Sequence, residues 1–561
     1  MLRSVCAGII YIGLYTGLVL ILPIEAAEPG EGKSVCFDQP AHSGGETEAR
    51  PAASQPNIVF ILADDLGYGD LGCYNPQGKI PTPHLDRLAR EGMRFTDAHT
   101  TSAVCTPTRY ALLTGRYSWR SRLQSGVLGG LSPPLIPPER LTLPGLLRKA
   151  GYHTACIGKW HLGLGWPRKP NTPPFTDSIE KGPEGWNVDY TKPIAEGPLS
   201  VGFDEFYGLA GSLDMVPYVF IHNDRVPIVP TVDKAFPMIL GRSAMTRRGP
   251  AAAEFEAVDV LPILTKKAIQ YIHERAAEAR SRKPFFLYLA LASPHTPIVP
   301  SESWQSRSGL NPYADFVMQT DDCVGQVVAA LEKEGLAENT LLFFSSDNGP
   351  SPQADFGALR DKGHDSAGGF RGAKADLWEG GHRVPLLVRW PGRIQAGTTT
   401  DQLVGLVDLM ATCAELLGVE LPDNAAEDSF SFLPVLLGKA SGPVRETLIL
   451  HSVSGKFAIR QGPWKLLLTP GSGGWSRPTD AEARRQGLPE VQLYHLADDP
   501  AEQKNFQAQH PEMVQRLIQL LERQVAEGRT RPGIPQKNDV PVDIWKRPPP
   551  PAKPEQKPEK Q

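Results

Sequence analysis

The chain is poor in cysteine and has almost no net charge, and both shortages narrow the classes of protein it can be. Its 561 residues include only 7 cysteines, scattered along the sequence, which excludes a scaffold built on disulfides. The formal net charge is −4, so no global basic field exists and nucleic acid is not an expected partner. No asparagine is followed two residues later by Ser or Thr. That absence argues against a lysosomal or extracellular animal glycoprotein.

The N-terminus carries a long apolar run. One Arg precedes residues 5–24, and Ala26 and Ala27 follow them, which is typical of a secretory signal over residues 1–27. An uncleaved membrane anchor stays open, because the run is close to membrane-spanning length. Residues 28–55 have no apolar period and are expected to form a linker. We expect an exported protein, periplasmic in a bacterium or secreted, that meets a membrane only if its leader is retained.

Apolar runs alternate with helical patterns between residues 56 and 438. Residues 57–63 are continuously apolar and β-branched, which indicates a strand buried on both faces of a parallel sheet. More strands are expected at 285–292, 341–345 and 385–389, with helices at 83–91, after Pro107, and at 143–150, 254–279, 313–334 and 403–417. This alternation predicts an α/β catalytic domain over 56–438, with a mostly parallel central sheet sandwiched by helices.

The pattern changes after Gly438. Short alternating runs at 447–451, 457–461, 464–468 and 491–495 are separated by turn residues and precede a helical pattern at 511–527. They predict a smaller C-terminal subdomain over 439–530, built from an antiparallel sheet plus a helix. Residues 531–561 are rich in Pro and Lys towards their end and are expected to be disordered.

A short motif begins at Cys105. The sequence Cys-Thr-Pro-Thr-Arg runs from Cys105 to Arg109 and leads into a helical Ala-Leu-Leu stretch. Arg109 lies one helical turn after Cys105, so both side chains are expected on one face of the helix. By itself, the motif could equally mark a buried or free cysteine before a helix started by proline.

Two acidic pairs follow apolar strands. Asp64 and Asp65 close the first strand, and Asp347 and Asn348 close the strand at 341–345. Ligands gather at the carboxyl ends of strands in such sheets, and these hard oxygen donors suit calcium or magnesium. Either pair alone could be a helix cap or an Asx turn.

Basic side chains and histidines recur in three further segments. Lys159 and His161 lie two apart in Gly-Lys-Trp-His-Leu-Gly, His295 has a proline on either side, and Lys374 lies in a glycine-rich approach to the strand at 385–389. Fixed cations offset the charge of an anionic ester. Alone, the first segment would more often be a turn with solvated polar groups, and His382 is interpreted as structural.

Taken together and in this order, these residues resemble the type I sulfatases, close to arylsulfatase A and the N-acetylgalactosamine-6-sulfatases. The resemblance spans about residues 56–525, and Thr108 stands where the family commonly has Ser. It implies that a maturation enzyme oxidises Cys105 to formylglycine beside one calcium ion. The implied metal site is Asp64, Asp65, Cys105, Asp347 and Asn348, and the implied catalytic set is Cys105, Arg109, Lys159, His161, His295 and Lys374.

The resemblance also implies roles and leaves alternatives. His295 would protonate the leaving alcohol, His161 would remove a proton from the hydrated aldehyde, and the cationic side chains would hold the sulfate. The substrate would be a sulfated carbohydrate or an aryl sulfate. A phosphate or phosphonate monoester hydrolase remains an alternative, as does an unconverted protein that binds sulfated glycans. Loops at 165–240 and 470–488 are expected to set specificity, and they hold aromatic residues that could stack on a sugar or simply pack the loops: Trp166, Trp186, Tyr190 and Trp475.

Overall fold

The central feature of the computed structural model, which describes residues 55–240 and 243–546, is a sheet of nine strands. Their order is β12-β2-β11-β10-β1-β9-β4-β5-β6. The bounds are β1 Asn57–Ala63, β2 Met93–Phe95, β4 His153–Lys159, β5 Glu205–Leu209, β6 Ile221–His222, β9 Phe285–Ala290, β10 Thr340–Ser346, β11 Leu386–Arg389 and β12 Thr398–Thr400. The predicted leader and almost all of the predicted linker lie outside the described residues.

The five strands β10, β1, β9, β4 and β5 run parallel to one another. β11 and β6 run antiparallel to their neighbours. Every residue of β1 is buried, and Phe60 pairs with Phe343 on one side and Tyr288 on the other. The predicted mostly parallel sheet is therefore confirmed, and its parallel strands end at one edge.

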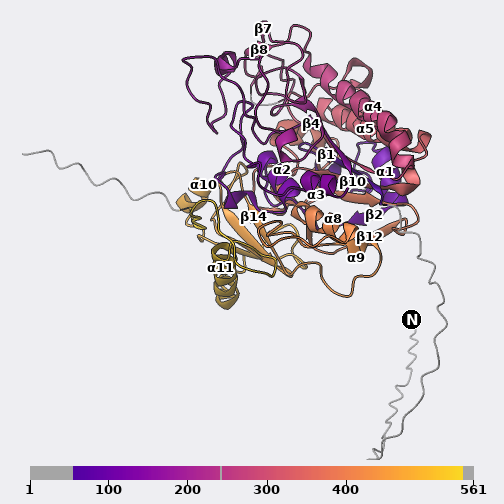
Figure 1. Ribbon diagram of the computed structural model, residues 1–561. Helices are drawn as coiled ribbons and strands as arrows, with labels where there is room; N and C mark the ends of the chain where they lie inside the picture. The colour runs from indigo at the N-terminus through magenta and orange to yellow at the C-terminus, as the bar shows by residue number, and fades with distance from the viewer. Residues whose placement is uncertain (1–54, 241–242, 547–561) are drawn as a thin grey trace, which may run out of the picture. The chain divides into compact units, whose positions relative to one another are not determined.

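Helices cover both faces of this sheet. α1 (Pro83–Glu91), α4 (Val260–Arg280) and α5 (Pro312–Lys333) pack together, while α2 (Cys105–Thr114), α3 (Leu143–Lys149) and α8 (Leu409–Leu417) form a second group. Figure 1 shows these two groups on different sides of the central strands. Among the described residues, no helix is both long enough and apolar enough to cross a bilayer.

The C-terminal part forms a four-stranded antiparallel sheet in chain order. Its strands are β14 Thr447–His451, β15 Phe457–Gln461, β16 Trp464–Leu467 and β17 Gln492–His495, and α11 (Pro511–Ala526) buries Leu517, Leu521 and Val525 with them. The apolar core of this sheet also contains Tyr117, Trp119, Leu377 and Trp378. The second sheet therefore shares its core with segments that belong to the predicted catalytic domain.

Shorter elements complete the described chain. They are β3 Ala98–His99, β7 Val232–Lys234, β8 Gly249–Ala251, β13 Val404–Gly405, α6 Phe356–Asp361, α7 Glu379–His382, α9 Leu433–Leu436 and α10 Asp480–Arg485.

Several elements differ from the sequence expectation. The strands β4 and β5 were not expected, because His, Thr, Gly and Glu interrupt their apolar runs. The helix expected from residue 403 begins at Leu409, because Val404 and Gly405 pair with β3 instead. The segment 531–546 packs against the rest of the chain, although it was expected to belong to a disordered tail. Asp539 pairs with the buried Arg116 at 3.0 Å, which composition alone does not reveal.

Candidate active site

Polar residues from four neighbouring parallel strands meet at the carboxyl edge of the central sheet. Asp64 and Asp65 follow β1, Asp347 follows β10, His295 lies beyond β9, and Lys159 ends β4. The backbone N–H of Asp347 donates to the carbonyl of Ala63 at 3.1 Å, which extends the pairing of the strands into the site. The acid pairs therefore lie side by side because of parallel strand pairing.

Asp64 is fully buried and has one occupied and one unpartnered oxygen. Lys159 Nζ donates to Asp64 Oδ2 at 2.6 Å, and Arg109 Nη2 lies 3.6 Å from the same atom. Asp64 Oδ1 is buried and accepts no hydrogen bond. Such an atom is costly inside a protein unless another group, such as a metal ion, binds it.

Asp65 adopts a left-handed backbone conformation, with φ of 66°. Its carboxylate accepts from Asn348 Nδ2 at 2.7 Å and from Lys374 Nζ at 2.7 to 2.8 Å, and His295 Nε2 lies 3.7 Å away. The amide oxygen of Asn348 is buried and unpartnered, like Asp64 Oδ1. Two oxygen atoms of this polar cluster, Asp64 Oδ1 and Asn348 Oδ1, thus have no hydrogen-bond partner and could bind a metal ion.

Arg109 joins the cysteine helix to the acids. Its Nε and Nη2 donate to Asp347 Oδ2 at 3.0 and 2.7 Å, and its Nη1 donates to the carbonyl of Lys159 at 2.9 Å. Cys105 begins α2 one turn earlier and is 2% exposed. Burial raises the pKa of the Cys105 thiol, so the unmodified side chain is neutral. The helix therefore presents Cys105 at the acids while Arg109 fixes its position.

The two histidines of the site have defined hydrogen-bond partners. His161 Nε2 lies 2.7 Å from the carbonyl of Leu128, so it must donate, and Nδ1 is left as a buried, unpartnered acceptor. Burial and the charges of Lys159 and Arg109 hold the pKa of His161 well below its usual value, so the ring is neutral. His295 Nδ1 lies 2.7 Å from the carbonyl of Thr296, so it donates there and leaves Nε2 towards Asp65.

The carboxylates and the open oxygens form a set that fits a hard divalent cation. Ligand atoms of Asp64, Cys105 and Asp347 lie within 4.8 Å of one another, as do those of Asp64, Asp65 and His295. Burial opposes ionisation of Asp64, but Lys159 and the other nearby cations hold its pKa well below the usual range. Burial and the Asp64 charge raise the pKa of Asp347. A cation bound between the two would relieve this repulsion, and the open oxygens of Asp64 and Asn348 are the donors that calcium prefers.

The predicted site residues are therefore gathered at one place, although their roles stay predictions. Hydrogen bonds and ion pairs connect Asp64, Asp65, Arg109, Lys159, Asp347, Asn348 and Lys374, with Cys105 and His295 within ligand distance of the acids. Sequence reasoning missed Ser212, which follows β5 at the same edge and has a buried hydroxyl without a partner. It also missed Leu128, whose carbonyl fixes His161. The signal for Ser212 would have been β5 itself, which was not expected as a strand.

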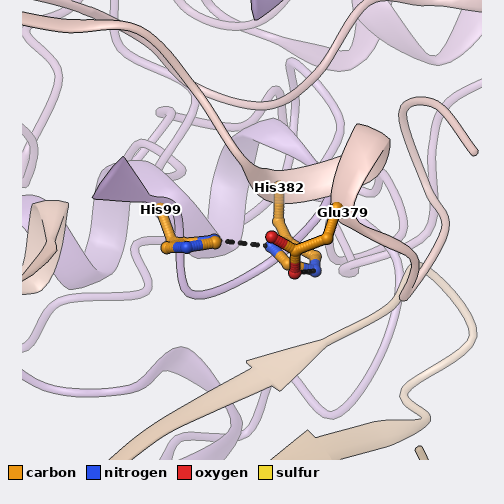
Figure 2. A group of neighbouring side chains, drawn as sticks. All are labelled: His99, Glu379 and His382. Atoms are coloured by element: carbon orange, nitrogen blue, oxygen red, sulfur yellow. Dashed lines mark hydrogen bonds and ion pairs between the residues drawn. The ribbon is translucent and has the colours of Figure 1, made fainter. Parts of the chain in front are cut away.

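A second buried polar cluster contains His382 together with His99 and Glu379 (Figure 2). Side-chain atoms of His99, Glu379 and His382 lie within 4.8 Å of one another. Lys465 Nζ already bonds to Glu379 at 2.9 Å and to His382 Nε2 at 3.0 Å. A lysine ammonium therefore occupies the place where a metal would bind, and this cluster does not fit a metal ion.

The two histidines make further polar contacts inside the cluster. His382 Nδ1 lies 3.0 Å from His99 Nδ1, and His382 Nε2 also lies 3.0 Å from the carbonyl of Leu377. His99 Nε2 lies 2.8 Å from Asp97 Oδ1 and 3.2 Å from Arg460 Nη1. Burial lowers the pKa of both histidines, which supports neutral rings.

Comparison with known proteins agrees with the geometry. The sulfatase family profile matches residues 56–419, and the profile for the C-terminal part of N-sulphoglucosamine sulphohydrolase matches residues 373–468. The chain belongs to the sulfatase family. The chain is 34% identical to the N-acetylgalactosamine-6-O-sulfatase of Bacteroides thetaiotaomicron over 84% of its own length and 93% of the relative's. It is 35% identical to human arylsulfatase A over 86% and 89%.

The fold comparison gives the same family. A solved structure whose description concerns the metabolism of multiple glycosaminoglycans by Bacteroides thetaiotaomicron superimposes with a TM-score of 0.72 at 33% identity. It covers 84% of this chain and 99% of that one. The sulfatase resemblance read from the sequence is confirmed, and the protein is a sulfatase-type hydrolase of sulfate esters.

Proposed function

We propose that this sulfatase works through a formylglycine made from Cys105 and a calcium ion held by Asp64, Asp65, Asp347 and Asn348. The observation that carries the proposal is a pair of buried oxygens without a hydrogen-bond partner, Asp64 Oδ1 and Asn348 Oδ1. Asn348 is bonded to Asp65, and a carboxylate oxygen of Asp64 lies within 4.8 Å of Cys105 Sγ. The aldehyde supplies, once hydrated, two hydroxyl groups on one carbon, where a serine would supply one.

Charge balance supports a bound cation. Three carboxylates, of Asp64, Asp65 and Asp347, face three cationic side chains, of Arg109, Lys159 and Lys374. A calcium ion supplies Lewis-acid charge that leaves the site net positive, as binding of an anionic sulfate ester requires.

The chain's own groups then take distinct roles. For His295 to protonate the leaving alcohol, the ring carries a second proton on Nε2, because its Nδ1–H is committed to the carbonyl of Thr296. His161 accepts a proton at Nδ1, the nitrogen that its bond to Leu128 leaves free. Lys159 and Lys374 bind sulfate oxygens, and Arg109 fixes the position of Cys105 relative to the acids.

We further propose a sulfated carbohydrate as substrate, with aryl sulfates as the simplest alternative. The names of the relatives support this class, since one acts on 6-sulfated N-acetylgalactosamine. Of the four aromatic residues in the predicted specificity loops, Trp166 and Tyr190 are buried and pack edge to face on each other. Trp475 is 39% exposed, and its loop is bonded to the segment that carries Lys374 through Asp376.

The decisive experiment uses protein produced with and without a formylglycine-generating enzyme. Mass spectrometry of the Cys105 peptide should show conversion of the thiol to an aldehyde only after co-expression, and turnover should rise with the converted fraction. The substrates are 4-nitrophenyl sulfate, 4-nitrophenyl phosphate and a panel of sulfated sugars that includes N-acetylgalactosamine 6-sulfate. Equal turnover by unconverted protein would contradict the mechanism, and preference for the phosphate would favour the phosphomonoesterase alternative.

Export is part of the same proposal. The apolar N-terminal run supports passage through a membrane before or during maturation, in a bacterial periplasm or into the medium. N-terminal sequencing of the exported protein should find the chain cut near Ala27. Retention of residues 1–27 in a membrane fraction would instead identify an anchor.

A further inference from the structure

The carboxylate of Glu180 joins its own loop to two other loop segments, 128–130 and 212–216, and the first of these contacts His161. Glu180 belongs to the long loop between β4 and β5 and is only 6% exposed. Its Oε2 accepts from the backbone N–H of Gly130 at 3.0 Å, and its Oε1 accepts from that of Val216 at 3.2 Å. The side chain therefore ties the segment 128–130 to the segment 212–216.

The segments 128–130 and 212–216 can approach each other because positions 129 and 130 are glycines. A Cβ on Gly129 would lie 2.2 Å from Glu180 Oε2, and a Cβ on Gly130 would lie 2.1 Å from the carbonyl oxygen of Val216. Real Cβ atoms do not come that close, so any other residue at either position would push the segments apart. Trp166 adds a third tie, since its Nε1 donates to the carbonyl of Gly130 at 2.9 Å.

The segment 128–130 is in turn in contact with the active site. The carbonyl of Leu128 accepts from His161 Nε2 at 2.7 Å, and the N–H of Leu128 donates to Thr106 Oγ1 at 3.2 Å. Thr106 is the residue after Cys105. One short segment thus contacts both the motif that carries Cys105 and the histidine whose Nδ1 is left open.

We propose that Glu180 is a positioning residue of this sulfatase, which holds Leu128 so that His161 presents an unprotonated Nδ1 to the reacting groups. The inference rests on the proposed role of His161. Among the described residues, no hydrogen bond or ion pair joins Glu180 to the acids, to Cys105 or to His161, so its effect on His161 is expected to pass through the 128–130 segment. At pH 8, where Glu180 is ionised, its buried carboxylate accepts two N–H groups, which a neutral amide of the same shape cannot do, since the amide nitrogen would face a second donor. The kinetic comparison is therefore made at pH 8.

The test compares Glu180→Gln and Gly129→Ala with Glu184→Gln in the matured enzyme. Glu184 is the matched control, because its carboxylate also accepts two backbone N–H groups, of Lys181 and Gly182, but in a partly exposed turn. We expect kcat on the best substrate to fall about ten- to a hundredfold in the first two variants, with KM within about threefold, because a displacement of about 1 Å costs about that much. Glu184→Gln should match the wild type.

A double-mutant cycle with His161→Gln separates positioning from general damage. If Glu180 acts through His161, adding Glu180→Gln to His161→Gln should lower kcat no further, whereas an independent structural role would multiply the two losses. Nitrogen-15 spectra of histidine-labelled protein give a second readout that needs no activity. The His161 signal, assigned by its loss in His161→Gln, should show the Nε2–H tautomer in the wild type and a mixture of tautomers in Glu180→Gln.

The outcomes distinguish this inference from the proposed function. If His161→Gln retains full activity, the proposed role of His161 fails, whatever Glu180 does. Two results would overturn the positioning role of Glu180 and leave the sulfatase mechanism standing, provided that His161→Gln is impaired. In the first, Glu180→Gln behaves like Glu184→Gln. In the second, adding Glu180→Gln to His161→Gln multiplies the two losses of kcat and the tautomer of His161 does not change in Glu180→Gln.

Discussion

The substitution Lys465→Met should measure how strongly a buried cation holds the C-terminal sheet to the rest of the protein. Lys465 lies on β16 and is fully buried. Its Nζ donates hydrogen bonds to Glu379 Oε1 at 2.9 Å and to His382 Nε2 at 3.0 Å, and it forms an ion pair with Glu502 Oε1 at 2.9 Å. Glu379 belongs to α7, which lies in the glycine-rich segment after Lys374. Methionine is an unbranched side chain one atom shorter than lysine, and it removes the charge and the hydrogen bonds of the ammonium group.

The expected loss follows from what stays behind. Glu379 keeps Arg383, whose Nη1 lies 3.0 Å from its Oε2, but Glu502 loses the one cation with which it forms an ion pair in the described structure. Breaking a buried pair by removing one partner costs about 3–5 kcal/mol, since a buried charge is left uncompensated. Burial and the Glu379 charge already raise the pKa of Glu502. Glu502 should therefore take up a proton as the pH falls, so the loss should be smaller at pH 5.5 than at pH 8.

The assay is guanidinium unfolding followed by intrinsic tryptophan fluorescence at both pH values. The matched control is Lys456→Met, beside β15. Within the described residues, the Lys456 ammonium bonds to two carbonyl oxygens, at 3.3 and 3.4 Å, so this variant should lose less than about 1 kcal/mol. Adding Glu502→Gln to Lys465→Met should recover part of the loss at pH 8. A loss below that of the control, or a loss that grows as the pH falls, would refute the reasoning.

Three further predictions concern the site and its surroundings. Cys105→Ser should release at most one equivalent of alcohol per enzyme in a single burst, and Cys105→Ala none; continued turnover by the serine variant would rule out a need for two hydroxyl groups on one carbon. Chelation by EGTA should abolish activity, added calcium should restore it, and Asn348→Ala should raise the calcium concentration needed about ten- to a hundredfold, because one open oxygen ligand is lost. Burial, with a smaller contribution from Asp214 that Arg247 opposes, raises the pKa of Glu180 from 4.5 to about 7. Glu180 therefore binds a proton on folding, and its contribution to stability is complete below pH 4.5 and lost as the pH rises through 7. The wild type should lose about 3 kcal/mol relative to Glu180→Gln between pH 4 and 8 in denaturant titrations, and parallel curves would contradict the assignment.

The sequence predicts the centre of the fold well, because β1 and β10 each contain a continuous apolar run, at 58–63 and 341–344, and an acid follows each strand. Parallel pairing then brings Asp64 and Asp347 together, as predicted from their places after two strands. β4 was missed because His153, Thr154 and Gly158 break its apolar run, although every residue after His153 is buried.

Other parts of the molecule have no local signal in the sequence. Glu180 lies in a polar, proline-containing loop and looks like a solvated carboxylate, yet the glycines at 129 and 130 bring backbone donors to it from a distant segment. Lys465 sits in an ordinary alternating strand, and its three partners come from two other parts of the chain. Such contacts arise from tertiary packing, which neither periodicity nor motif spacing encodes.

The shared core of the second sheet has a consequence for chimeric enzymes. Trp119 packs on Phe457 with ring centroids 5.2 Å apart, and the backbone N–H of Ala103, two residues before Cys105, donates to the carbonyl of His451 at 3.0 Å. A graft that exchanges everything after residue 438 for the equivalent part of a relative would therefore replace one wall of the aromatic core and one support of the cysteine loop together. Working hybrids will need the 102–119 region and the part after residue 438 to be inherited from the same parent.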